Sequence, residues 1–270
     1  VTAVPAGSVG PVTAPCTTTG APGPRSTGSA STTSLGLSDA TFAELLRTLR
    51  FQHFKWDTYA CGACLIMPEA IVLTRAAHET LVETVEALDA ALRRFETAVR
   101  RDRAALARLA IPAALHDIIA AEREETLQIA RYDLFPCDDG RWMVSEFNED
   151  VPGGYNEAVI PGLLGAPPQG LAWEGDLRRS FTAAFRQHER VAFLYATAFS
   201  EDLQHMLILE HWLQQEGHRT VLASPEHLHS RWRRPHVLGQ RVDAAFRFYP
   251  AEWMPALTNM AAWQRLGPAL

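Results

Sequence analysis

Four polar side chains in the stretch 130–154 (ARYDLFPCDDGRWMVSEFNEDVPGG) have types and spacing that could do chemistry together. Arg131 and Asp133 stand two residues apart, and so do Glu146 and Asn148. Residues two apart in a β-strand point to the same face, so each pair would present its side chains together. Carboxylate and amide oxygens are ligands that Mg²⁺ accepts, and an arginine can contact a phosphate or a developing anion. The pattern therefore indicates metal-assisted handling of a phosphate.

The two pairs would face each other if the segment between them forms a β-hairpin. The Asp-Gly pair at 139–140 is a strong signal for a two-residue turn, which predicts cross-strand pairs whose residue numbers sum to 279. Asp133 then lies opposite Glu146, and Arg131 lies opposite Asn148. Two facing carboxylates repel each other, and a divalent cation would remove that penalty. The alternative is a solvated hairpin face on which Arg131 neutralises Asp133, and a longer turn would break the register.

The composition excludes several classes of protein. The chain has 270 residues, 47% of them hydrophobic, and a formal net charge of −6, which gives no reason to expect nucleic acid or an anionic membrane as a partner. No apolar run approaches the roughly 18–20 residues that span a bilayer. The N-terminus also lacks the basic-then-apolar order of a signal peptide, so the expected location is the cytoplasm.

Cysteine and lysine usage limit the chemistry further. Cys61 and Cys64 have the spacing of half a zinc site or a redox pair, but no second pair completes four ligands. We therefore expect reduced, partly buried thiols. Of the 25 basic residues only Lys55 is a lysine, so an enzyme that grips nucleotide phosphates with several lysines would have almost none here.

The elements that must position these residues fall into three regions. Residues 1–36 are rich in Ser, Thr, Gly, Pro and Ala, which predicts a flexible low-complexity tail. Residues 37–126 form a helical segment, which begins with an N-cap at Ser38 and includes a long helix with an apolar stripe over 81–99. That stripe is expected to pack within one domain rather than in a coiled-coil dimer.

The third region, 127–270, changes character to α/β. After the hairpin, an apolar run at 191–197 reads as a strand, a helix follows Ser200, and further strands are expected at 220–223 and 242–249. Strand, helix and strand in this order predict parallel βαβ units in a mixed sheet. The expected fold class is α/β (α+β), with a helical segment before the sheet and no Gly-rich phosphate loop.

Two separated motifs resemble those of glutathionylspermidine synthase and its circularly permuted ATP-grasp relatives. The Arg-x-Asp and Glu-x-Asn pairs, with Asp150 and Pro152 close behind, are similar to the family's metal-binding segment. The stretch FRFYPAEWM at 246–254 resembles the family's Lys-Leu-Tyr-Pro-Trp-Glu-Trp-Met signature, with Arg247 where the signature has lysine. The likeness covers roughly residues 40–260.

The resemblance implies an ATP-dependent carboxylate–amine ligase with a partial ATP-grasp-like architecture. A small-molecule or peptide carboxylate would take the terminal phosphoryl group of ATP, and an amine would displace phosphate from the acyl phosphate to give an amide. Carried over to this chain, Asp133, Glu146 and Asn148 would hold Mg²⁺ against the ATP phosphates. Arg131 would be catalytic, stabilising the acyl phosphate and the tetrahedral species that follows it.

Two points stay open. Gly153 and Gly154 could bring backbone N–H groups to a substrate carboxylate, or could form a plain flexible turn. The relatives' nucleotide-holding lysines lie downstream of the second motif, whereas Lys55 lies far upstream. We therefore expect the chain to lack the nucleotide-clamping half, which a missing C-terminal half or a partner chain would supply. The alternative is a non-catalytic pre-ATP-grasp-like binding module or a subunit of a split ligase.

Overall fold

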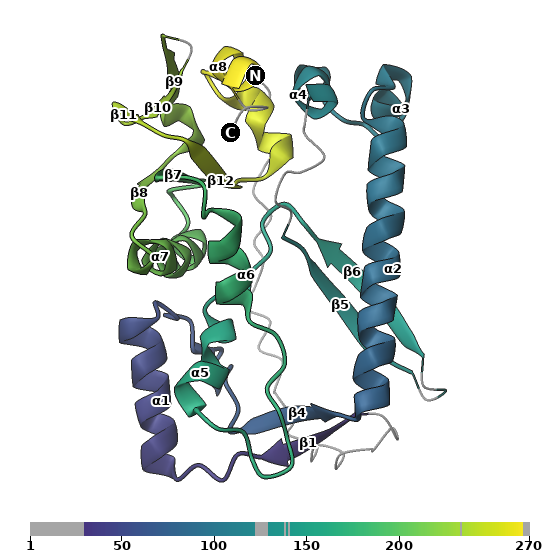
Figure 1. The fold of residues 1–270 in the computed structure, drawn as a ribbon, viewed down its shortest axis with the longest axis vertical. Helices are drawn as coiled ribbons and strands as arrows, with labels where there is room; N and C mark the ends of the chain where they lie inside the picture. Colours follow the sequence, from purple (N-terminus) through teal and green to yellow (C-terminus); the bar gives the residue numbers. More distant parts are fainter. Residues whose placement is uncertain (1–29, 122–128, 138, 140, 233, 267–270) are drawn as a thin grey trace, which may run out of the picture.

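The computed structural model describes residues 30–121, 129–137, 139, 141–232 and 234–266 (Figure 1). Its helices and strands are, in chain order, β1 (Ala30–Ser34), α1 (Asp39–Gln52), β2 (Tyr59–Ala60), β3 (Ala63–Cys64), β4 (Glu69–Leu73), α2 (Arg75–Val99), α3 (Arg103–Arg108), η1 (Ala113–Leu115), α4 (His116–Ala121), β5 (Arg131–Pro136), β6 (Trp142–Asn148), η2 (Glu157–Val159), α5 (Ile160–Leu164), α6 (Leu177–Ala184), β7 (Arg190–Tyr195), α7 (Ser200–Gln215), β8 (Arg219–Ala223), η3 (Pro225–His227), β9 (Leu228–Arg231), β10 (Arg234–Val237), β11 (Gln240–Arg241), β12 (Ala244–Phe248), η4 (Ala251–Ala256) and α8 (Met260–Leu266).

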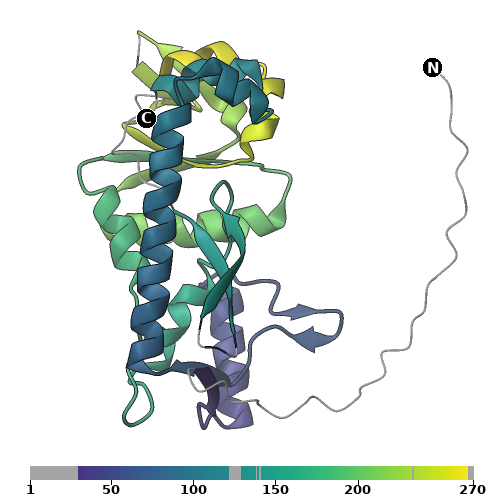
Figure 2. The same ribbon diagram turned by 90° about the vertical axis from the view of Figure 1, so that its right-hand side faces the viewer.

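The first helix, α1, begins at its predicted cap. The Ser38 hydroxyl accepts a hydrogen bond from the Thr41 N–H and caps α1. The predicted long helix is α2, with 25 residues. Its apolar stripe is only partly covered, because Leu92 and Phe95 stay 38% and 52% exposed. Figures 1 and 2 show α2 running alongside the β5–β6 hairpin.

The expectation of a flexible tail through residue 36 is wrong for residues 30–34. These residues form β1, which pairs antiparallel with β4 from Ala30 opposite Leu73 to Ser34 opposite Glu69. Ordering this segment costs conformational entropy, and it has few apolar side chains to offset that cost. Backbone hydrogen bonds to a second strand offset it instead. The remainder of the predicted tail, residues 1–29, lies outside the described part of the chain.

The segment read as helical also contains strands. β2 and β3 form a small hairpin whose two turn residues, Cys61 and Gly62, both have positive φ, at 50° and 80°. Cys64 lies opposite Tyr59 in this hairpin, so the two cysteines do not face each other. Both are free thiols, as expected, but Cys61 is exposed rather than partly buried.

The predicted parallel layer is confirmed. β12, β7 and β8 form a three-stranded parallel sheet in that order, with Val191 of β7 opposite Ala244 and Thr220. α7 connects β7 to β8, so strand, helix and strand build one βαβ unit. The chain is of mixed α/β architecture, as the sequence predicted.

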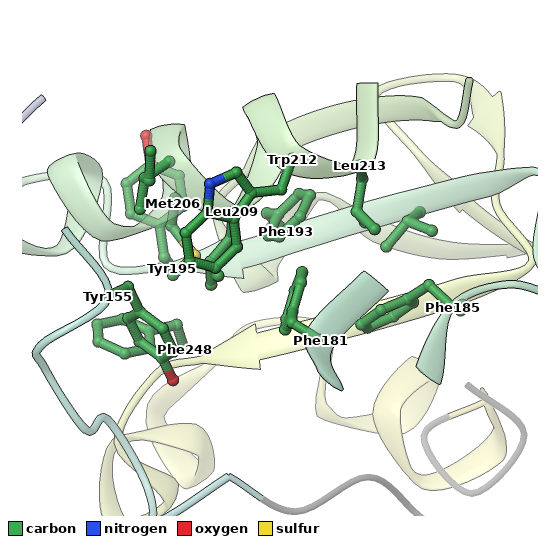
Figure 3. Packing of buried hydrophobic residues seen from close by; sticks show 13 residues of the cluster. Tyr155, Phe181, Phe185, Phe193, Tyr195, Met206, Leu209, Trp212, Leu213 and Phe248 are labelled. Carbon is green, nitrogen blue, oxygen red and sulfur yellow. The ribbon is translucent and has the colours of Figure 1, made fainter. Parts of the chain in front are cut away.

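The core lies on both faces of this sheet. Successive residues of β7 point to opposite faces: Phe193 joins the cluster beneath α6 and α7, whereas Leu194 joins the cluster with α8. Figure 3 shows the first cluster, in which Phe181, Phe193 and Trp212 pack together. Burial on both faces explains why this strand reads as a continuous apolar run. Within the described ranges, no helix is both long enough and apolar enough to cross a membrane.

Candidate functional site

The β5–β6 hairpin brings the two predicted pairs together. Asp133 lies opposite Glu146, and Arg131 opposite Asn148, so the predicted register is confirmed at these positions. Nearer the turn, the observed register differs from the predicted one by one residue, since Leu134 lies opposite Val144.

A β-bulge reconciles these two registers. The Cys137 N–H donates to the Arg141 carbonyl, so the connection is longer than the two-residue turn that the Asp-Gly pair predicts. The register shift between Asp133 and Leu134 leaves Ser145 as the extra residue on β6. Without it, Glu146 would lie opposite Tyr132 on the other face. The bulge therefore places both carboxylates on one face despite the longer turn.

The four side chains contact one another on this face. Arg131 is bidentate to Asp133, with Nε 2.8 Å from Oδ1 and Nη2 3.2 Å from Oδ2. The same Nη2 lies 3.6 Å from Glu146 Oε1, and Asn148 Nδ2 donates to that oxygen at 2.6 Å. The hydrogen bond from Arg131 holds the pKa of Asp133 below its ordinary value, and the Asp133 carboxylate in turn raises the pKa of Arg131. Both partners are therefore charged at neutral pH.

The donor set fits a magnesium ion that keeps water and phosphate in its shell. Two carboxylates and one amide oxygen are what Mg²⁺ takes from proteins when substrate phosphates complete its coordination. The side chains of Asp133 and Glu146 are 37% and 56% exposed, so a hydrated ion could reach them. No group of three or more His, Cys, Asp or Glu side chains suited to a metal occurs among the described residues. Arg131 now covers the oxygens of Asp133, so an ion would bind there only after that contact opens.

The predicted glycines lie beside the arginine. A Cβ atom at Gly153 would stand 3.6 Å from Arg131 Nη1 and only 3.1 Å from His205 Nε2, so a larger residue here would displace the His205 ring by a few tenths of an ångström. Gly154 has φ +108°, a conformation that other residues rarely adopt. Both candidate roles of these glycines, backbone N–H groups for a substrate carboxylate and a plain turn, stay predictions.

Asp150 ties the hairpin to the parallel layer. Its Oδ1 lies 2.5 Å from Arg247 Nη1, and its Oδ2 accepts a hydrogen bond from the Ala251 N–H at 2.5 Å. Arg247 also donates to the Tyr249 carbonyl. The two motifs, which are about a hundred residues apart in sequence, are thus joined directly in space.

This junction lies where α/β folds bind ligands. From β7 the chain passes through α7 to β8 on one side, and β12 lies on the other side of β7. In such sheets, ligands bind outside the carboxyl ends of the strands, at the point where the connections turn to opposite sides of the sheet. Here that point lies between β7 and β12. Asp202, in the first turn of α7, has its pKa raised to about 6 by burial and by the neighbouring Glu201. A second titratable carboxyl therefore stands near this edge.

A buried lysine forms a cluster, called here the buried lysine cluster, with two partly exposed carboxylates: Lys55, Asp57 and Glu157. Lys55 is 5% exposed, and its Nζ contacts Asp57 Oδ1 at 2.9 Å and Glu157 Oε1 at 2.7 Å. Burial opposes its charge, but the two carboxylates outweigh burial and raise the pKa of Lys55. The only lysine of the chain is therefore engaged in internal ion pairs.

Sequence reasoning missed this cluster and the neighbouring His205. Gln204 and His205, both on α7, are only 2% and 9% exposed. The signal that could have found them is a pair of polar residues inside a helix that is otherwise buried on most sides.

Comparison with known proteins bears on the same residues. A family model described as glutathionylspermidine synthase preATP-grasp matches residues 43–264, which include the hairpin and the parallel layer. No curated protein matches the chain.

Proposed function

We propose a function for this chain, which belongs to the glutathionylspermidine synthase preATP-grasp family. It is the metal- and substrate-handling part of an ATP-dependent carboxylate–amine ligase. In this reaction a carboxylate oxygen attacks the terminal phosphorus of ATP and releases ADP. An amine then attacks the carbonyl carbon of the acyl phosphate, and phosphate leaves. The products are an amide, ADP and inorganic phosphate.

The hairpin face supplies the charges that this chemistry needs. Asp133, Glu146 and Asn148 would hold Mg²⁺, which when bound would neutralise charge on the phosphate oxygens. Arg131 stands over the same face, and its guanidinium has the fork geometry that suits phosphoryl oxygens as well as carboxylates. The observation that carries the proposal is the convergence of these four side chains on one face through two cross-strand pairs.

One observation favours a second function, a binding module without turnover. Lys55 is buried in its ion pairs and does not reach the hairpin face, so the site has no lysine for a nucleotide. Arg131 and one ion give limited affinity against water. We expect this chain alone to bind Mg·ATP in the millimolar range, or about −4 kcal/mol.

Hydroxylamine trapping tests the ligase function. Hydroxylamine converts an acyl phosphate into a stable hydroxamate, so no amine substrate needs to be known. The full chain is incubated with Mg·ATP and glutathione, the probe carboxylate suggested by the family name. We expect hydroxamate above the background without protein, and its loss in Arg131→Met.

Arg141→Met is the matched control. Arg141 lies on the same hairpin and also pairs with an aspartate, Asp139, but at the end of the hairpin away from the site. Its hydroxamate yield should equal that of the unaltered chain. Magnesium-dependent ATP binding without any hydroxamate would instead establish the binding module.

A further inference from the structure

The hydrogen bonds of His205 fix the position of its proton. Asn156 Nδ2 donates to two backbone carbonyls, those of His53 at 2.7 Å and Gln204 at 3.0 Å. Carbonyls only accept, so the orientation of the amide is set and its Oδ1 faces His205 as an acceptor. His205 Nδ1 lies 2.7 Å from this oxygen and must therefore carry the ring proton. In the neutral ring, Nε2 is then left with a lone pair.

That lone pair points to the space beside the candidate site. A Cβ at Gly153 would lie 3.1 Å from His205 Nε2 and 3.6 Å from Arg131 Nη1, so both nitrogens flank the point that the glycine leaves open. Among the described residues, no group hydrogen-bonds to Nε2. At this point His205 Nε2 accepts a hydrogen bond from an N–H or O–H donor, whereas Arg131 Nη1 on its other side can only donate.

The surroundings keep the ring neutral and oriented. His205 is 9% exposed, and burial lowers its pKa. Its ring makes edge contacts with Tyr155 and Phe248 at centroid distances of 5.6 and 5.7 Å. The charged groups that act on it are Glu157 and Asp57, which favour protonation, and Lys55 and Arg131, which oppose it. A ring that is neutral at pH 7 keeps Nε2 available to take a proton.

We propose that His205 Nε2 is the base that accepts a proton from the ammonium form of the amine substrate, with Asn156 as its positioning residue. This inference rests on the proposed ligase function. It identifies the ligand next to Gly153 as a primary alkylammonium group.

The step balances as follows. The ammonium gives one proton to His205 Nε2, and the freed lone pair forms the C–N bond to the acyl carbon. The C–O bond to phosphate breaks with its electron pair on phosphate, which takes the second proton from the amine nitrogen. The imidazolium then returns its proton to solvent, and no oxidant or reductant is involved.

A first experiment follows the ring itself in the full chain. Long-range ¹H–¹⁵N spectra with labelled histidine report which ring nitrogen carries the proton, and the signal is assigned by its loss in His205→Gln or by its shift in Asn156→Asp. We expect the Nδ1–H tautomer at pH 7. We also expect propylammonium, but not tetramethylammonium, which has no N–H, to shift the Nε2 signal.

Gly153→Ala tests the direction of the lone pair. The new methyl group covers Nε2 and should abolish the propylammonium shift, while the tautomer stays unchanged. An Nε2–H tautomer, a charged ring at pH 7, or an equal shift with tetramethylammonium would overturn the proposal. These readouts do not need an active ligase.

A second experiment separates the base from the ligase function. Hydroxylamine is largely uncharged at neutral pH and does not need a base, whereas an alkylamine does. His205→Gln should therefore lower the rate of amide formation with propylamine at least about 100-fold more than it lowers the hydroxamate yield. Equal loss of both products would overturn the role of His205. Absence of hydroxamate even from the unaltered chain would count against the ligase function alone, and the spectra would then decide the role of His205.

Discussion

Replacing Lys55 by methionine tests whether the buried lysine cluster holds the site together. The change keeps an unbranched side chain that is one atom shorter and removes its charge. It leaves the carboxylates of Asp57 and Glu157 next to each other without their cation. Glu157 Oε2 is already buried without a hydrogen-bond partner among the described residues, so it has nothing to offset the loss.

The expected cost follows from the exposure of the three side chains. Removing one member of a fully buried ion pair costs about 3–5 kcal/mol. Here the lysine side chain is 7% exposed, but those of Asp57 and Glu157 are 41% and 37% exposed, so water screens much of the repulsion. We expect Lys55→Met to lower the free energy of unfolding by about 2 kcal/mol at pH 7.

The pH dependence gives a second signature. Lys55 lowers the pKa of Asp57 in the folded chain, against the opposing effect of burial. This stabilisation is present above the unfolded pKa of about 3.9 and is lost as the pH falls through the lower, folded pKa. In Lys55→Met the Asp57 carboxylate has lost this cation, so its protonation stabilises the folded chain instead. The difference between the two chains should therefore shrink as the pH falls from 7 towards 4.

Urea unfolding followed by tryptophan fluorescence at pH 7 and pH 4.5 measures both effects. Lys55→Arg, which keeps the charge, serves as the control and should cost less than methionine at pH 7. A loss below about 0.5 kcal/mol for Lys55→Met, which is the range of ordinary surface substitutions, would refute the argument. A loss that does not change with pH would show that packing rather than charge is responsible.

Three further changes test other parts of the account. Phe193→Ala should lower the free energy of unfolding by about 3–5 kcal/mol in urea, because it empties the core beneath α7, whereas Phe135→Ala on the exposed hairpin surface should cost little. Asp150→Asn should weaken the contact with Arg247 and raise the amide hydrogen exchange of β5 and β6, and unchanged exchange would contradict the anchoring role. When the pH falls from 7.5 to 5.5, the free energy of unfolding should decrease less in His205→Gln than in the unaltered chain. The unfolded chain binds the histidine proton first, below about pH 6.5, and equal pH slopes would count against the lowered pKa.

The hairpin shows how far sequence reasoning reaches. Alternation along the strands and an Asp-Gly turn signal predicted the pairing of Asp133 with Glu146, which the structure confirms. The reasoning nevertheless missed both the longer turn and the bulge at Ser145, whose effects on the register cancel at the site. Turn length and bulges depend on local backbone geometry that the alternation of residue types does not encode.

The surroundings of the site could not be predicted in the same way. The bond from Asn156 to the His53 carbonyl spans 103 residues, and that from Trp56 N–H to Gln204 spans 148. Such contacts follow from how the layers pack, not from spacing along the chain. Strand β1 was missed for a related reason, because its partner β4 lies in another segment of the sequence.

Binding of Mn·ATP, with Mn²⁺ as a paramagnetic substitute for Mg²⁺, tests the central claim most directly. Water-proton relaxation reports binding in the millimolar range, and the comparison is between Asp133→Ala and Asp139→Ala, two aspartates of the same hairpin. We predict that Asp133→Ala weakens binding at least about 10-fold, or about 1.4 kcal/mol, while Asp139→Ala leaves it unchanged. Equal affinity in both variants would contradict a metal and phosphate site on this face of the hairpin.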